Sequence, residues 1–140
     1  MEIWLLIFQS VKSGFPFLIS HFSTAIVIFL IGLWLYTKVT PMNELDLIKN
    51  GNIAASISFL GACIGVAIPL AVCLASSVNI ADIIIWGSIA VALQLICFRV
   101  VDLVLKDLSK RIIDDEISIA IALVGCKISV ALINAAAISA

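Results

Sequence analysis

Four long stretches with almost no charge restrict the fold of this chain more than any other feature. They cover residues 17–37, 51–81, 83–98 and 117–140, and His21 and Lys127 are the only acidic or basic side chains within them. A transmembrane helix needs about 20 predominantly apolar residues, so each stretch predicts one such helix. The chain has 140 residues, 64% hydrophobic and 12% charged, and a soluble fold of this length could not bury so much apolar surface. We expect an all-α membrane protein with four transmembrane helices in a single domain, residues 1–140.

The segment before the first span, Met1 to Ser13, differs from a secretory signal peptide. A signal peptide begins with a basic region and ends in a small-residue cleavage site, whereas this segment has Glu2 and Trp4 near its start. Gly14 and Pro16 follow it and are expected to separate it from the first span. The pattern predicts a short N-terminal interfacial helix that anchors the chain at the membrane surface.

The basic residues near the ends of the spans predict the orientation. Lysine and arginine gather on the cytoplasmic side of membrane proteins, and the connection between the second and third spans, residues 78–82, has neither. The other two connections hold Lys38, Lys49, Arg99, Lys106, Lys110 and Arg111. We therefore expect both termini outside and the two longer connections in the cytoplasm.

An internal repeat is suggested by a shift of 64 residues, which places the fourth span on the second. The matched pairs are Ile53/Ile117, Ile57/Ile121, Gly61/Gly125, Ile64/Ile128, Val66/Val130, Ala67/Ala131 and Ala71/Ala135. The pattern predicts two tandem two-helix units, residues 17–77 and 81–140, inserted the same way up. Each unit is expected to start its second span with a polar cap, from Asn50 or Asn52 in one and from Asp114 or Asp115 in the other.

Small residues at helical spacing mark candidate packing positions. Gly61 and Gly65 form a GxxxG pair, and Gly125 and Ser129 keep the same spacing in the fourth span. This spacing lets helix backbones approach closely in lipid, and it serves contacts within one chain or between subunits equally well. Pro69 removes a backbone hydrogen bond within the second span and predicts a kink there.

Three polar side chains inside the spans form a candidate intramembrane site: Gln94, Lys127 and Asn134. A charged side chain at this depth costs about 2.5 to 3.5 kcal/mol on insertion scales. No carboxylate is expected at the depth of Lys127, so its expected partners are Gln94, carbonyls freed near Pro69, water or another subunit. Two interpretations stay open, namely an ion-binding position in a wet cavity and hydrogen bonds that join helices.

Several kinds of site have no signature in the sequence. No catalytic constellation, cofactor motif or metal motif is present, and the four cysteines fall inside apolar spans, where they serve as packing residues. The net charge of -1 gives no reason to expect a nucleic-acid partner. The acidic residues of the longer connections are expected to lie in solvent: Glu44, Asp46, Asp107, Asp114, Asp115 and Glu116.

Motifs from the end of the first span to the C-terminus resemble one family. Residues 40–44 read TPMNE, residues 47–56 read LIKNGNIAAS, and residues 61–70 read GACIGVAIPL. The face of Trp86, Ala90 and Gln94 and the closing NAA at residues 134–136 add to the pattern. The chain resembles the YjfL family, also called domain of unknown function 350, and the resemblance implies a bacterial inner-membrane protein with four helices. Lys127 departs from the family pattern, in which a small or apolar residue is usual.

Two hypotheses about function follow. The first is a non-enzymatic structural or partner-binding component of the bacterial envelope, surrounded by the lipid bilayer and able to join a second copy or another envelope protein. The second is a small oligomeric channel or transporter with a polar path near Gln94, Asn134 and Lys127. Within four helices there is little room for a pore, so a channel would require a symmetric oligomer.

Overall fold

The computed structural model describes residues 2–139 and consists of six helices joined by short turns. Four are long and apolar enough to cross a membrane, as predicted. They are α1 (Glu2–Val39), α3 (Ile53–Ser76), α4 (Ile80–Val104) and α6 (Ile117–Ile138), and the short helices are α2 (Glu44–Lys49) and α5 (Leu108–Ile113). The prediction of an all-α membrane protein with four transmembrane helices is confirmed.

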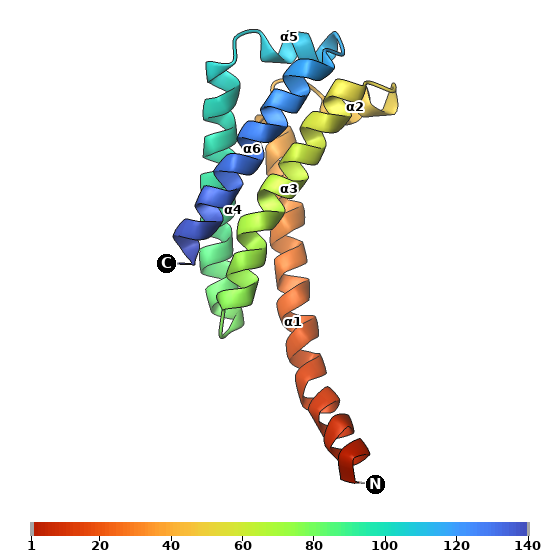
Figure 1. Ribbon diagram of the computed structural model, residues 1–140, viewed down its shortest axis with the longest axis vertical. Helices are drawn as coiled ribbons and strands as arrows, with labels where there is room; N and C mark the ends of the chain where they lie inside the picture. The colour runs from red at the N-terminus through yellow and green to blue at the C-terminus, as the bar shows by residue number, and fades with distance from the viewer. Residues whose placement is uncertain (1, 140) are drawn as a thin grey trace.

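Helix α3 lies at the centre of the bundle, where it packs against α1, α4 and most extensively α6 (Figure 1). Its buried face is made largely of small residues: Ala54, Ala55, Ser58, Gly61, Ala62 and Gly65. Small side chains let neighbouring helices approach closely. In a membrane the surrounding lipid tails are as apolar as the side chains, so close packing, rather than the hydrophobic effect, holds the helices together. The helix continues through Pro69 to Ser76. The composition of α3 therefore explains its central position.

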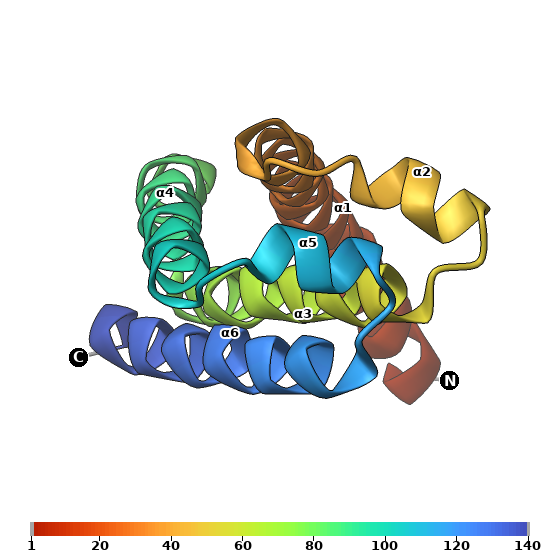
Figure 2. The same ribbon diagram turned by 90° about the horizontal axis from the view of Figure 1, so that it is seen from above.

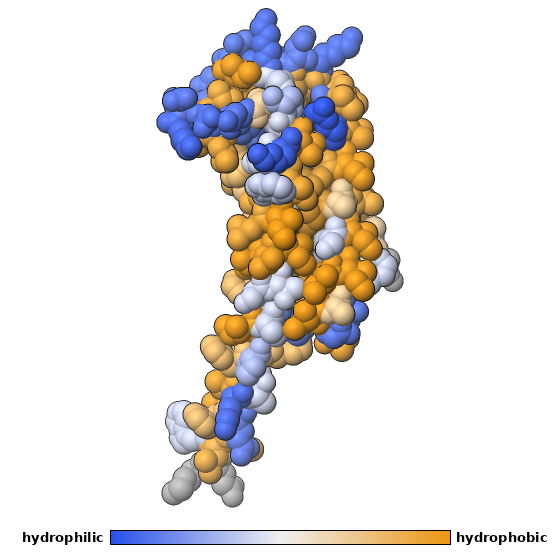
Figure 3. Space-filling view, turned by 180° about the vertical axis from the view of Figure 1, so that it is seen from behind, coloured by the Kyte–Doolittle hydropathy of each residue, from blue (hydrophilic) through white to orange (hydrophobic). Residues whose placement is uncertain are grey.

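The two short helices cover one end of the bundle (Figure 2). There, Met42, Leu108, Ile112 and Leu123 form a core with small residues of α3 and α6. Hydrophilic side chains gather on this end and a broad hydrophobic band lies below them (Figure 3), which is the pattern expected for a bilayer-spanning protein. We call the end covered by α2 and α5 the capped end of the bundle.

Helix α1 is one continuous helix of 38 residues, with Pro16 inside it. The prediction that Gly14 and Pro16 separate an interfacial helix from the first span is therefore wrong, because Pro16 gives up one backbone hydrogen bond without ending the helix. At about 1.5 Å per residue the helix is roughly 57 Å long, and its N-terminal part projects beyond the other helices (Figure 1). The predicted position of this segment at a membrane surface stays a prediction.

Helix bounds recur at the spacing of the proposed repeat. The shift of 64 residues takes Glu44–Lys49 onto Leu108–Ile113, and the first residue of α3, Ile53, onto the first residue of α6, Ile117. It also takes Gly51 onto Asp115, and both have a positive φ, of 84° and 60°. Helices α3 and α6 start at the same end (Figure 1). The tandem two-helix repeat stays a prediction that these bounds support.

The capped end ties the two halves of the chain together. Asn52 caps α3 as predicted, because its side-chain oxygen accepts from the Ala55 amide at 2.6 Å. Its amide group also donates to the carbonyls of Ile112 and Ile113, at 2.9 and 3.1 Å. Asp115 accepts from the Ala54 amide at 2.7 Å and so also caps α3. The expectation that Asp114 or Asp115 caps α6 is wrong, since the N-cap residue of α6 is Glu116 and makes no side-chain cap bond.

Candidate functional site

The turn after α1 brings a carboxylate back against the bundle. Thr40 closes the helix by donating its amide and its hydroxyl to the Tyr36 carbonyl, each at 2.9 Å, and Pro41 cannot continue the helical hydrogen bonding. Met42 is buried against α3, so the first residue of α2, Glu44, points inward and is only 3% exposed. The expectation that Glu44 lies in a solvated loop is wrong, because the tertiary packing of this turn buries it.

Four side chains form a closed hydrogen-bonded ring, which we call the charge network: Tyr36, Glu44, Ser58 and Lys127. The Lys127 ammonium donates to the hydroxyl oxygens of Tyr36 and Ser58, at 2.7 and 3.2 Å. Both hydroxyl groups donate to the same oxygen, Glu44 Oε1, at 2.9 Å from Tyr36 and 2.7 Å from Ser58. Lys127 and Glu44 are thus joined through two hydroxyl bridges.

The network is enclosed by protein. Lys127 and Ser58 have no exposed surface, and the Lys127 ammonium lies 4.7 Å from the ring centre of Tyr36 and 5.3 Å from that of Phe98. An aromatic face attracts a cation most strongly when water is excluded. The expectation that no carboxylate lies near Lys127 is wrong, because α2 folds Glu44 back toward it.

The second oxygen of Glu44 has no partner. Among the described residues, Glu44 Oε2 is one of two buried side-chain polar atoms without a hydrogen bond, the other being His21 Nε2. Burial raises the pKa of the Glu44 carboxyl above its ordinary value, while the nearby Lys127 ammonium acts in the opposite direction. Oε2 can therefore take up a proton without breaking either bond at Oε1.

Gln94 and Asn134 extend the polar groups away from the capped end. Asn134 donates to the Gln94 side-chain oxygen at 3.2 Å and to the Ala90 carbonyl at 3.0 Å, and Gln94 donates to the backbone carbonyl of Lys127 at 3.2 Å. The three residues predicted from the sequence thus lie together. Gln94 contacts the backbone of Lys127, however, and the ammonium has Tyr36 and Ser58 as partners.

The four predicted packing residues divide into two pairs. A Cβ added at Gly61 would lie 3.2 Å from the Val124 backbone, and one added at Gly65 would lie 2.6 Å from Phe98. Gly61 thus permits the close approach of α3 and α6, and Gly65 leaves room for the Phe98 ring beside Lys127. Gly125 and Ser129 are exposed on α6, and a Cβ at Gly125 would meet nothing within 4 Å. A role for Gly125 and Ser129 in subunit contact stays a prediction.

Tyr36, Ser58 and Glu44 were not predicted as site residues. Tyr36 is the single tyrosine of the chain and lies near the end of an apolar stretch, and Glu44 closes the TPMNE motif at residues 40–44. These signals mark the residues as unusual but do not place them beside Lys127, which lies far along the chain. No cluster of three metal-binding side chains was found among residues 2–139.

The fold and the network define a small polytopic α-helical membrane protein with a buried, hydroxyl-bridged lysine–carboxylate pair. The model of the family described as Domain of Unknown Function (DUF350) matches residues 10–138. The chain belongs to this family, and the predicted resemblance is confirmed.

Relatives in two strains of one bacterium agree with this assignment. The chain is similar to the UPF0719 inner membrane protein YjfL of Escherichia coli strain K12, with 41% identity over 95 residues, which cover 68% of this chain and 72% of the relative. The protein of the same description from Escherichia coli O157:H7 matches with the same values. No solved structure matches the chain. The protein is thus a multi-pass protein of the bacterial inner membrane.

Proposed function

We propose that this is a non-enzymatic proton-translocating protein of the inner membrane, with the charge network as its proton-binding site. The observation that carries this proposal is the buried Lys127–Glu44 pair bridged by the Tyr36 and Ser58 hydroxyls. Such a pair is weak support for stability, because apolar residues of similar volume often replace buried charge pairs without loss. Ionisable residues at membrane depth are instead characteristic of ion and proton pathways.

The geometry favours a proton over a larger species. Lys127, Ser58 and Gln94 have no exposed surface, so the network leaves little space for a substrate. Its members are joined by hydrogen bonds of 2.7 to 3.2 Å, along which a proton can pass between carboxylate, hydroxyl and amine. The unpartnered Glu44 Oε2 provides the position at which a proton enters from the capped end. Gln94 and Asn134 continue the polar groups toward the opposite end, where water would have to complete the path.

Proton flux into liposomes tests the proposal. Purified protein would be reconstituted with a pH-sensitive dye inside the vesicles, and a potassium diffusion potential would drive proton entry. Wild type and the control Lys110→Met, at an exposed position of α5, should acidify the lumen, whereas the double variant Glu44→Gln, Lys127→Met should reduce the rate at least about tenfold. The double variant leaves no unpaired buried charge and should fold. A rate of proton entry into vesicles with wild-type protein that is no higher than into empty vesicles would contradict the proposal.

A second candidate function, partner binding in the envelope, is favoured by the length of α1. The helix is roughly 57 Å long at about 1.5 Å per residue, whereas the hydrocarbon core of a bilayer is about 30 Å thick. The side chains of residues 3–13 are all exposed, and apolar ones such as Ile3, Trp4 and Phe8 predominate near the N-terminus. Apolar side chains beyond the hydrocarbon core are stabilised when they lie in the interface or against another protein. This segment is therefore the best candidate for contact with a second copy or an envelope partner.

A further inference from the structure

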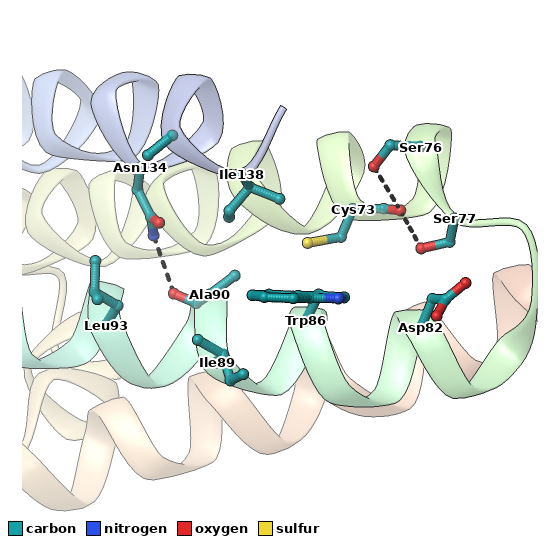
Figure 4. Close-up of a pocket in the computed structure, with 11 residues that line it drawn as sticks. Cys73, Ser76, Ser77, Asp82, Trp86, Ile89, Ala90, Leu93, Asn134 and Ile138 are labelled. Carbon is teal, nitrogen blue, oxygen red and sulfur yellow. Dashed lines mark hydrogen bonds between the residues drawn. The ribbon is translucent and has the colours of Figure 1, made fainter. Parts of the chain in front are cut away.

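A groove lies at the end of the bundle opposite the capped end, between the last turns of α3 and α6 and the first half of α4 (Figure 4). Its volume is about 680 Å³, within the range of roughly 300 to 1,000 Å³ that small-molecule sites occupy. Its walls are the last turns of α3 and α6, which end at Ser76 and Ile138, and α4 from Asp82 to Leu93. We call it the distal groove.

The lining of the distal groove is polar at one end and apolar along its length. Ser76, Ser77 and Asp82 form the polar end, next to the turn between α3 and α4. From Asp82 the groove follows α4 past Trp86 and Ile89 to Leu93 (Figure 4), a length of roughly 16 Å at about 1.5 Å per residue. Trp86, Ile89 and Leu93 are 55%, 48% and 47% exposed. In a bilayer these half-exposed side chains open the groove sideways to lipid, so an amphiphile can enter from the membrane.

The electrostatics of the polar end favour a cation. Among residues 2–139, which the structure describes, Asp82 is the one charged residue that lines the groove. Among the described residues its carboxylate has no hydrogen bond or ion pair, and its backbone amide donates to the Asn79 side-chain oxygen at 3.0 Å. Helices α3 and α6 both end here, and the C-terminus of a helix carries a partial negative charge. The N-terminus of α4, with Asp82 in its first turn, carries a partial positive charge that opposes this effect, so the Asp82 carboxylate is the main group that would stabilise a cation here.

Trp86 adds a second feature that suits a cation with an apolar body. It lies one helical turn after Asp82, on the same face of α4. The face of an indole ring attracts ammonium groups and packs well against hydrocarbon. The hydroxyl groups of Ser76 and Ser77 both donate to the Cys73 carbonyl, at 3.3 and 2.6 Å, so their oxygen lone pairs can face a cation. At the other end of the groove, the Asn134 side-chain amide donates to the Ala90 carbonyl and to the Gln94 side-chain oxygen.

We propose that the distal groove binds an amphiphile with a cationic ammonium head group. The head group lies between Asp82 and Trp86, and the hydrocarbon chain follows Ile89 and Leu93 toward Asn134. The proposal rests on the lining of this groove and does not depend on proton movement through the charge network.

Quenching of Trp86 by brominated amphiphiles tests the proposal. The chain has three tryptophans, so the variant Trp4→Phe, Trp34→Phe leaves Trp86 as the only reporter. In nanodiscs, 11-bromoundecyltrimethylammonium should quench Trp86 saturably, and the anion 11-bromoundecanoate should bind at least about tenfold more weakly. Asp82→Asn should weaken binding of the cation about tenfold, the effect expected for one lost charge contact. It should not weaken quenching by the anion, because loss of the carboxylate removes a repulsion, and retained quenching by the anion shows that the groove is intact. Asp46→Asn on α2 should change the binding of neither amphiphile.

Two results would overturn the proposal. Equal quenching by cation and anion would show an apolar groove without charge selectivity. Cation binding that survives Asp82→Asn would show that the carboxylate does not hold the head group.

Discussion

At the scale of single residues, the unusual feature is a lysine that lies inside the bundle and makes no direct contact with a carboxylate among residues 2–139. The hydroxyl groups of Tyr36 and Ser58 accept hydrogen bonds from its ammonium and donate hydrogen bonds to Glu44. Desolvation of a charge costs several kcal/mol, and these bonds, together with the Tyr36 and Phe98 rings, offset part of that cost. Lys127 could be singled out from the sequence because it interrupts an apolar stretch. Its partners could not, because they come from α1, α2 and α3.

The buried Glu44 carboxyl should make stability depend on pH. Its pKa is raised by burial and, to a smaller extent, by Asp102, and is lowered by Lys127 and by the two hydroxyl bonds. The folded protein therefore holds this proton more tightly than the unfolded chain does. The contribution is fully present below the ordinary glutamate pKa of about 4.3 and is lost as pH rises through the raised value, with a slope of at most about 1.4 kcal/mol per pH unit.

Thermal unfolding in detergent measures this contribution. The stability of wild type relative to Glu44→Gln should fall as pH rises from about 4.3 through the raised pKa, while Asp46→Asn, on the exposed side of α2, should follow the wild-type profile. A relative stability that increases with pH over this window would show that Glu44 is held in its charged form by the fold.

At the scale of elements, α3 organises the bundle because its small residues let three other helices approach it. The same spacing of small residues in α6 has a different outcome, since Gly125 and Ser129 face outward. The motif therefore predicts that helices can approach closely at these positions, and the tertiary structure decides whether a neighbour from the same chain is there. In α1, Gly14 and Pro16 suggested a helix boundary, but the helix continues through both residues.

Substitutions at the paired glycines test this distinction. Gly61→Val should lower the free energy of unfolding by about 1 to 3 kcal/mol, the usual range for overpacking, because the new side chain would collide with Val124. Gly125→Val should change it by less than about 0.5 kcal/mol, as at an open surface position. Denaturant titration in detergent compares the two, and equal losses would mean that Gly125 is packed in the protein as extracted.

At the scale of the whole molecule, the bundle has two ends of different character. The capped end is closed by α2, α5 and the cross-connections of Asn52 and Asp115, whereas the other end holds the distal groove and has the projecting part of α1 beyond it (Figure 1). Which end faces the cytoplasm stays a prediction from the distribution of lysine and arginine. The shape alone places the proposed proton entry at one end and the distal groove at the other.

Native mass spectrometry tests whether the projecting part of α1 makes a partner contact. Protein extracted gently from its own membrane should carry a second copy or another polypeptide, and a variant lacking residues 2–13 should appear as a single copy. The deletion should leave the melting temperature nearly unchanged, because residues 3–13 are exposed. A monomeric full-length protein would count against the partner-binding function and leave the proton proposal unaffected.

The sequence by itself determined the class of protein, the number of spans and the family, because lipid imposes a length and an apolarity that can be counted along the chain. It also marked Gln94, Lys127 and Asn134, since polar groups in apolar stretches are conspicuous. Only the tertiary structure decided that Tyr36, Ser58 and Glu44 complete the site, that Gly61 is packed while Gly125 is open, and that Asp115 caps α3. These features depend on how helices distant in the sequence are placed beside one another. The periodicity of residues along one helix does not indicate which face of a second helix packs against it.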